Sequence, residues 1–109
     1  MTSDAQFVNF IVDQMEGAGK ITSRKMFGEY GVYCNGKIVA LICKDRLYVK
    51  PTNAGRAYIN EVIEEPPYDG AKPYFLVGDQ IEDADWLAGL IRVSHEELPE
   101  PKNKKITRQ

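Results

Sequence analysis

Residue types that most often carry catalysis are few in this 109-residue chain, which has one histidine and two cysteines. His95 stands beside two glutamates near the end of an expected helix, where an imidazolium complements the helix dipole. Cys34 and Cys43 are nine residues apart with no histidine near them, so they match neither a zinc-ligand pair nor a Cys/His nucleophile pair. The sequence therefore predicts no catalytic residues, no metal site, no cofactor and no enzymatic activity.

Two other clusters have simple structural explanations. The acidic residues Glu82, Asp83 and Asp85 could be Mg²⁺ ligands or general acids, but their position before an apolar stripe is typical of a helix start, with Asp83 as the cap. Gly28 and Gly31 resemble a phosphate-binding loop, yet such a loop opens a helix, whereas this segment joins two expected strands. A tight turn is the prediction there.

Basic and aromatic residues alternate in the first half of the chain in a pattern that could bind nucleic acid by stacking and phosphate pairing. The overall pI near 5.4 favours another interpretation, because nucleic-acid-binding domains are usually basic. Direct nucleic-acid binding is possible but not favoured. The residues are Arg24, Lys25, Tyr30, Tyr33, Arg46, Tyr48 and Lys50.

The strands that would carry these residues are indicated by turn chemistry. Asn35-Gly36 is typical of a two-residue type I′ hairpin turn, here between strands at residues 31–34 and 37–42. Residues 46–50 alternate polar and apolar in the manner of a further strand. Two more strands are expected at residues 21–27 and 73–77, separated from the rest by turns and a loop at residues 64–72.

The hairpin register bears on the cysteines. Counting back from the turn pairs Cys34 with Lys37 and places Cys43 opposite Gly28. The two sulfurs would then lie about 20 Å apart at ~3.3 Å per residue, which excludes an intramolecular disulfide.

Alternation along the strands predicts two different sheet faces. The first is wholly apolar and is expected to face the core; it carries Ile38, Ala40, Ile42, Leu47 and Val49. The second is too apolar for simple solvent contact and too basic for a core, so it is either partly covered by another segment or used as an interface. It carries Val32, Cys34, Val39, Leu41, Cys43, Arg46, Tyr48 and Lys50.

Three helices complete the expected α+β fold. A capping box of Ser3 and Gln6 begins the first, which ends near residue 16. The second covers residues 52–63, and the third runs from the Asp83 cap to about residue 98. The inward residues expected in the second helix are Ala54, Ala57, Tyr58 and Val62, and those in the third are Trp86, Leu87, Leu90, Ile91 and Ser94.

The expected organisation is one domain at residues 1–98 and a flexible basic tail at residues 99–109. An antiparallel sheet of about five strands packs with N-terminal, middle and C-terminal helices. The chain has neither a long apolar segment nor a signal peptide, which predicts a cytoplasmic protein without membrane contact. Residues 20–50 carry a net charge of +5, whereas residues 59–98 hold ten acidic residues against two basic ones. This polarity suits a protein partner or self-association, although ordinary solvated surface explains it equally well.

Two segments resemble a known family. Residues 23–33 read SRKMFGEYGVY and residues 46–50 read RLYVK. They are similar to the Arg-Met-Phe-Gly-Gly-x-Gly core and the later Leu-Tyr-Leu-Lys strand of the TfoX/Sxy N-terminal domain, and the similarity extends over nearly the whole chain. Glu29 stands where the motif has its second glycine.

This resemblance implies an α/β sandwich in the secretion-chaperone-like style. In the full-length competence regulators a C-terminal helical domain follows, and the protein acts with the cyclic-AMP receptor protein at promoters. No such domain is expected in this chain, and a shared fold does not carry a shared function.

The sequence thus favours a non-enzymatic, competence-regulator-like interaction module of bacterial type, with a homodimer as one form of association. The expected binding surface comprises Arg24, Tyr30, Tyr33, Val39, Leu41, Arg46, Tyr48 and Lys50. One alternative is a small-ligand-binding protein or enzyme with a pocket between Arg24, Tyr33 and the loop containing Pro67 and Tyr68. The other is a DNA co-binding transcription factor, for which salt-dependent binding to duplex DNA would be the sign.

Overall fold

The computed structural model describes residues 5–26 and 29–99. They form an α+β fold, as predicted, with a six-stranded sheet in which every pairing is antiparallel. The helices are α1 (Ala5–Met15), α2 (Asn53–Ile59) and α3 (Ala84–Glu97), with short 3-10 helices at Glu16–Ala18 and Asp79–Glu82. The strands are β1 (Ile21–Met26), β2 (Glu29–Cys34), β3 (Lys37–Cys43), β4 (Arg46–Val49), β5 (Glu64–Glu65) and β6 (Tyr74–Val77).

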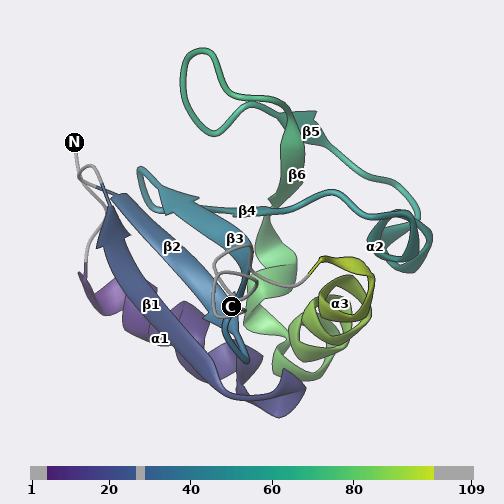
Figure 1. Cartoon of the computed structure of the whole chain (residues 1–109), viewed down its shortest axis with the longest axis horizontal. Helices are drawn as coiled ribbons and strands as arrows, with labels where there is room; N and C mark the ends of the chain where they lie inside the picture. The colour runs from purple at the N-terminus through teal and green to yellow at the C-terminus, as the bar shows by residue number, and fades with distance from the viewer. Residues whose placement is uncertain (1–4, 27–28, 100–109) are drawn as a thin grey trace, which may run out of the picture.

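The strands lie in the order β1-β2-β3-β4-β6-β5 (Figure 1). The sixth strand is the two-residue β5, in the segment predicted to be a loop, and it pairs with β6. Helices α1 and α3 pack side by side on one face of the sheet, and α2 packs against α3. The core between the helices and the sheet is fully buried and includes Ile11, Met15, Ile42, Leu47, Phe75, Leu87, Leu90 and Ile91.

The β2–β3 hairpin departs from the predicted register. From the turn outward the ladder follows the prediction as far as Tyr33, which pairs with Ile38. The next pair is Val32 with Ala40, so Val39 is the extra residue of a β-bulge. Because side chains alternate with a period of two, one extra residue exchanges the two faces of the strand on one side of the bulge.

The bulge corrects the predicted faces. Val32, Cys34 and Val39 are completely buried in the core, whereas the prediction placed them on the second face beside Leu41. Ile38 makes the opposite move, from the predicted core face to the other side of the sheet, where its side chain lies near Gly31. Val39 is therefore not a surface residue, and its assignment to the binding surface was wrong.

The helix boundaries follow their caps. The side chain of Asp83 accepts a hydrogen bond from the Trp86 backbone N at 3.1 Å, which confirms the predicted start of α3. The side chain of Thr52 accepts one from the Gly55 N at 2.8 Å, so the second helix begins as predicted but ends four residues early, at Ile59. The Ser3 cap predicted for the first helix lies outside the described residues, as does most of the predicted tail.

The inward face of α2 differs from the prediction. Ala57 is exposed, whereas Tyr58, predicted to face inward, contacts α3, where its hydroxyl donates to Trp86 O at 2.9 Å. The only fully buried residue of the helix is Gly55. A Cβ atom added there would meet Thr52 Oγ1 at 2.8 Å and Ser94 Oγ at 3.1 Å. Glycine is required because α2 approaches α3 too closely for a side chain, not because the backbone conformation is unusual.

Both cysteines are free and buried, in agreement with the expectation that they form no disulfide. The bulge changes the reason why the two cysteines cannot form a disulfide. Cys34 lies on the helix-covered face, where its thiol is 3.8 Å from Ala18 O, whereas Cys43 lies on the opposite face. The sheet itself separates the two sulfurs.

Candidate functional site: the outer face of the sheet

The face of the sheet opposite α1 and α3, here called the outer face, carries most of the residues singled out from the sequence. Strand pairing places Gly31 opposite Leu41, and Leu41 opposite Tyr48. A Cβ atom added at Gly31 would meet the side chains of Met26, Ile38 and Tyr33, all within 3.4 Å. These apolar side chains therefore share one surface across β1, β2 and β3.

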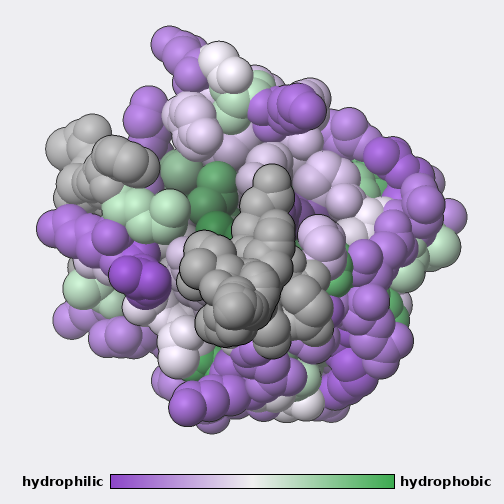
Figure 2. Space-filling model, viewed as in Figure 1, coloured by the Kyte–Doolittle hydropathy of each residue, from purple (hydrophilic) through white to green (hydrophobic). Residues whose placement is uncertain are grey.

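A hollow of about 500 Å³ opens on this face, here called the outer hollow. The described residues that line it are Met26, Glu29, Tyr30, Leu41, Cys43 and Tyr68. Tyr68 belongs to the loop between β5 and β6, so two segments far apart in the sequence form the walls. Figure 2 shows green apolar surface in this part of the molecule, with purple polar residues around it.

A second depression of about 520 Å³ adjoins the first, and Tyr68 lines both. Its described lining residues are Lys44, Arg46, Tyr48, Glu65, Pro66, Pro67, Tyr68 and Asp69. Here Arg46 and Glu65 form an ion pair at 3.5 Å across the sheet. Tyr48 is only 5% exposed, so the loop covers part of the outer face, one of the two outcomes expected for a surface of this composition.

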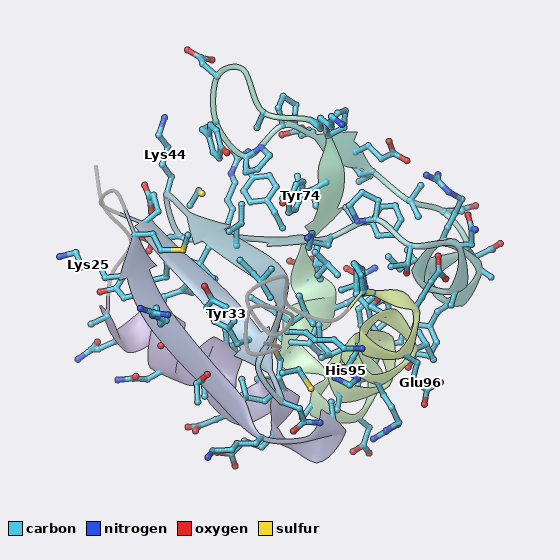
Figure 3. All side chains as sticks on the ribbon, viewed as in Figure 1. Lys25, Tyr33, Lys44, Tyr74, His95 and Glu96 are labelled. Carbon is cyan, nitrogen blue, oxygen red and sulfur yellow. The ribbon has the colours of Figure 1, made fainter. Side chains whose placement is uncertain are left out.

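Two ionisable groups in this region, Cys43 and Tyr74, have a raised pKa, which favours their neutral forms. Burial raises the pKa of the Cys43 thiol, and the nearby Glu29 carboxylate raises it further, against a smaller opposing effect of Lys44. Burial also raises the pKa of the Tyr74 hydroxyl, with smaller contributions from Tyr68 and Cys43. Figure 3 shows Lys44 and Tyr74 on either side of the space under the loop. A neutral thiol is a poor nucleophile, so this arrangement suits apolar contact better than covalent chemistry.

The structure brings together five of the eight predicted binding residues. Arg24, Tyr33, Leu41, Arg46 and Tyr48 all lie on the outer face. Tyr30 pairs with Ile42 on the helix-covered side but still borders the outer hollow. Lys50 follows β4, and its backbone N donates to Val39 O at 2.9 Å.

Sequence reasoning did not include several residues that shape the outer hollow. Met26 and Glu29 line it, and Cys43, although placed on this face, was not among the predicted binding residues. Tyr68 was named from the sequence as part of an alternative pocket with Arg24 and Tyr33. It lines the outer hollow, but Arg24 and Tyr33 are not among the described lining residues.

Other candidate groups lie elsewhere. His95 and Glu96 are on α3, away from the outer hollow (Figure 3). Within residues 5–26 and 29–99, no group of three or more His, Cys, Asp or Glu side chains could hold a metal ion. In the same described part of the chain, no helix is both long enough and apolar enough to span a membrane.

Comparison with known proteins shows the family to which the chain belongs. The family model of the TfoX N-terminal domain matches residues 13–98, so the chain belongs to the TfoX N-terminal domain family. The chain is also similar to a protein of Spirochaeta aurantia called "Uncharacterized 12.7 kDa protein in trpE 5′ region". The two are 38% identical over 105 residues, which covers 96% of this chain and 91% of that protein.

Proposed function

We propose that this chain is a non-enzymatic interaction module that binds a protein partner, or a second copy of itself, through the outer face of its sheet. The observation that carries the proposal is the outer hollow, where Leu41 and Met26 remain accessible between the sheet and an exposed loop tyrosine. Apolar side chains inside a polar rim are the usual composition of a protein interface. Membership of a family named after a competence regulator supports a regulatory role.

Electrostatics supports the same proposal. Arg46 and Lys44 border the apolar centre, so the rim can select a partner by charge while the centre supplies the contact area. The neutral Cys43 thiol and Tyr74 hydroxyl add no charge that would oppose burial under a partner.

The experiment is Leu41→Asp, which puts a charge in the outer hollow without entering the core. We expect a folded protein by circular dichroism that no longer associates in size-exclusion chromatography and no longer retains partners in a pull-down from native lysate. Ile63→Asp is the matched control, because Ile63 is an exposed aliphatic residue that does not line the outer hollow. It should leave association unchanged.

Two results would contradict the proposal. One is a wild-type protein that is monomeric and retains no partner that Leu41→Asp releases. The other is an unfolded Leu41→Asp variant, which would make this residue part of the core, like its neighbour Ile42.

A second candidate function is favoured by the size of the outer hollow. About 500 Å³ lies within the range of small-molecule sites, roughly 300–1,000 Å³, and its lining is mostly apolar with Glu29 as the charged group. A thermal-shift screen of small apolar compounds, repeated on Leu41→Asp, would detect such a ligand. A shift in the wild type that the variant loses would favour this function over protein binding.

A further inference from the structure

The strand β1 forms one end of the sheet and offers a free edge. It pairs only with β2, from Ile21 opposite Cys34 to Met26 opposite Glu29, and Figure 1 shows it along the outside of the molecule. A strand of this kind carries unpaired backbone groups that can accept a further strand. This edge is distinct from the outer hollow and independent of the function proposed for it.

The directions of the backbone groups follow from one hydrogen bond. The Asn35 N donates to Lys20 O at 2.8 Å, so positions 20 and 35 form a hydrogen-bonded pair of the antiparallel ladder. Such pairs alternate along the ladder, so Thr22 and Arg24 also direct their backbone groups at β2. The backbone N–H and C=O groups of the residues between them, at positions 21, 23 and 25, therefore point away from the sheet.

These outward groups have no partner in the part of the chain that the structure describes. No hydrogen bond outside the strand ladder joins Ile21, Ser23 or Lys25 to another described segment. The edge is therefore open over five residues. At about 3.3 Å per residue, it can pair with a short extended segment.

The charge of the edge is uniformly positive. Lys20, Arg24 and Lys25 are all exposed, and none has an ion-pair partner among the described residues. Residues 17–26 contain no Asp or Glu. The residues directly opposite Arg24 and Lys25 on β2 are Gly31 and Tyr30, neither of them acidic, and Glu29 of β2 lies opposite Met26.

We propose that the β1 edge binds an extended acidic segment of a partner protein as an added strand of the sheet. Backbone pairing with Ile21, Ser23 and Lys25 would hold the segment, and its acidic side chains would lie beside Arg24 on one face of the sheet and beside Lys25 on the other. A second copy of β1 fits less well, because antiparallel self-pairing would gather the basic residues of both chains along one seam without a counter-charge.

The test uses the full ¹⁵N-labelled chain and two hexapeptides, one alternating glutamate with valine and the other lysine with valine. With the acidic peptide, we expect amide exchange to slow at Ile21, Ser23 and Lys25. Exchange at Thr22 and Arg24 should change little, because their amides are already paired with β2. The basic peptide should have no such effect. Slower exchange at positions 21, 23 and 25 alone indicates that the peptide adds as a strand. Simple charge attraction would instead shift side-chain signals without protecting alternate amides.

Two variants test the two parts of the proposal, backbone pairing and charge attraction. Ser23→Pro removes one outward N–H and leaves the β2 pairing intact, so the protein should stay folded by circular dichroism but lose the protection. The double variant Arg24→Glu, Lys25→Glu should weaken acidic-peptide binding by about tenfold or more. Lys72→Glu is the control for a charge reversal away from the edge, because Lys72 is exposed in the loop before β6, and it should bind as the wild type does.

Three outcomes would overturn the proposal. They are equal protection by both peptides, unchanged binding by a folded Ser23→Pro variant, and protection of the same amides that rises with protein concentration in the absence of peptide. The last would assign the edge to a second copy of the chain. If neither peptide protects these amides, the basic side chains act only to keep the edge from aggregating.

Discussion

The carboxylate of Glu97 joins two helices that are far apart in the sequence. Its two oxygens accept hydrogen bonds from the Asn53 and Ala54 backbone N atoms, each at 2.9 Å. These donors belong to the first turn of α2, where amide groups have no partner within the helix. The two hydrogen bonds, led by that from Ala54, lower the pKa of the Glu97 carboxyl below its ordinary value.

This lowered pKa predicts a pH-dependent stability. The folded protein prefers the ionised carboxylate, so the stabilisation is complete above the unfolded-state pKa, about 4.3 for glutamate, and is lost as the pH falls through the lower folded value. We expect Glu97→Gln to be less stable than the wild type in urea unfolding at pH 7. The difference should shrink once the pH falls below about 4.

Glu96→Gln is the control for this measurement. It removes the same charge from the neighbouring position, which makes no hydrogen bond to α2. A loss of stability equal to that of Glu97→Gln would assign the effect to helix charge and not to the bond with α2.

At the scale of elements, the close contact of α2 with α3 depends on the absence of a side chain at Gly55. Gly55→Ala should destabilise the fold by about 1–3 kcal/mol, because the new methyl group would press on Thr52 Oγ1 and on Ser94 Oγ. The first contact would also disturb the helix cap. Urea unfolding measures the effect.

Ser94 provides the second half of this test. Its hydroxyl is fully buried and has no hydrogen-bond partner among the described residues, so Ser94→Ala alone should be nearly neutral or stabilising. Combined with Gly55→Ala it should recover part of the lost stability, because it removes one of the three atoms that crowd the new methyl group, which are Thr52 Oγ1, Ser94 Oγ and a ring carbon of Phe75. A double variant that is no more stable than Gly55→Ala would show that the contacts with Thr52 and Phe75 are responsible for the whole effect.

At this scale of helices and strands, part of the fold could be predicted from the sequence. The hairpin turn, the Asp83 cap and the strands at residues 21–26, 37–43 and 74–77 have strong local signals, and all are present. The β-bulge at Val39 has none, because its neighbours are apolar on both sides and either register buries hydrophobic residues. One extra residue was enough to move Val39 from the predicted binding surface into the core.

Of the candidate site, only the residues that lie on strands could be predicted from the sequence. Leu41, Tyr48 and Arg46 alternate correctly because they lie beyond the bulge, on β3 and β4. The wall formed by Tyr68 depends on how the loop folds over the sheet, and a loop of prolines and glycine has no periodicity from which to derive that position.

At the scale of the whole molecule, a few long-range side-chain contacts fasten the sheet to the helices. The Lys37 ammonium donates to His95 O at 3.1 Å and to Leu98 O at 2.9 Å, which ties the hairpin to the last turn of α3. A cation at a helix C-terminus also complements the helix dipole. At the other end of the helix layer, the Gln14 amide donates to Ile81 O at 2.8 Å.

We predict that Lys37→Met destabilises the protein by about 1 kcal/mol, because two carbonyls at the end of α3 lose a charged donor. Lys44→Met is the control, since Lys44 lies in the next turn along the sheet and its side chain is exposed. Thermal unfolding followed by circular dichroism compares the two. Equal melting temperatures for the two variants would mean that the bonds to α3 contribute nothing measurable.

The two ends of the sheet are unequal, and this limits how molecules can assemble along it. The strand β5 has only two residues, and both of its glutamates are ion-paired, Glu65 with Arg46 and Glu64 with Arg56. So short an edge has too few backbone groups to seed another strand. Among the strands of residues 5–26 and 29–99, growth of the sheet can therefore proceed only from β1. A chain that joins through one end alone forms pairs or one-to-one complexes, so the architecture is protected against open-ended polymerisation into fibres.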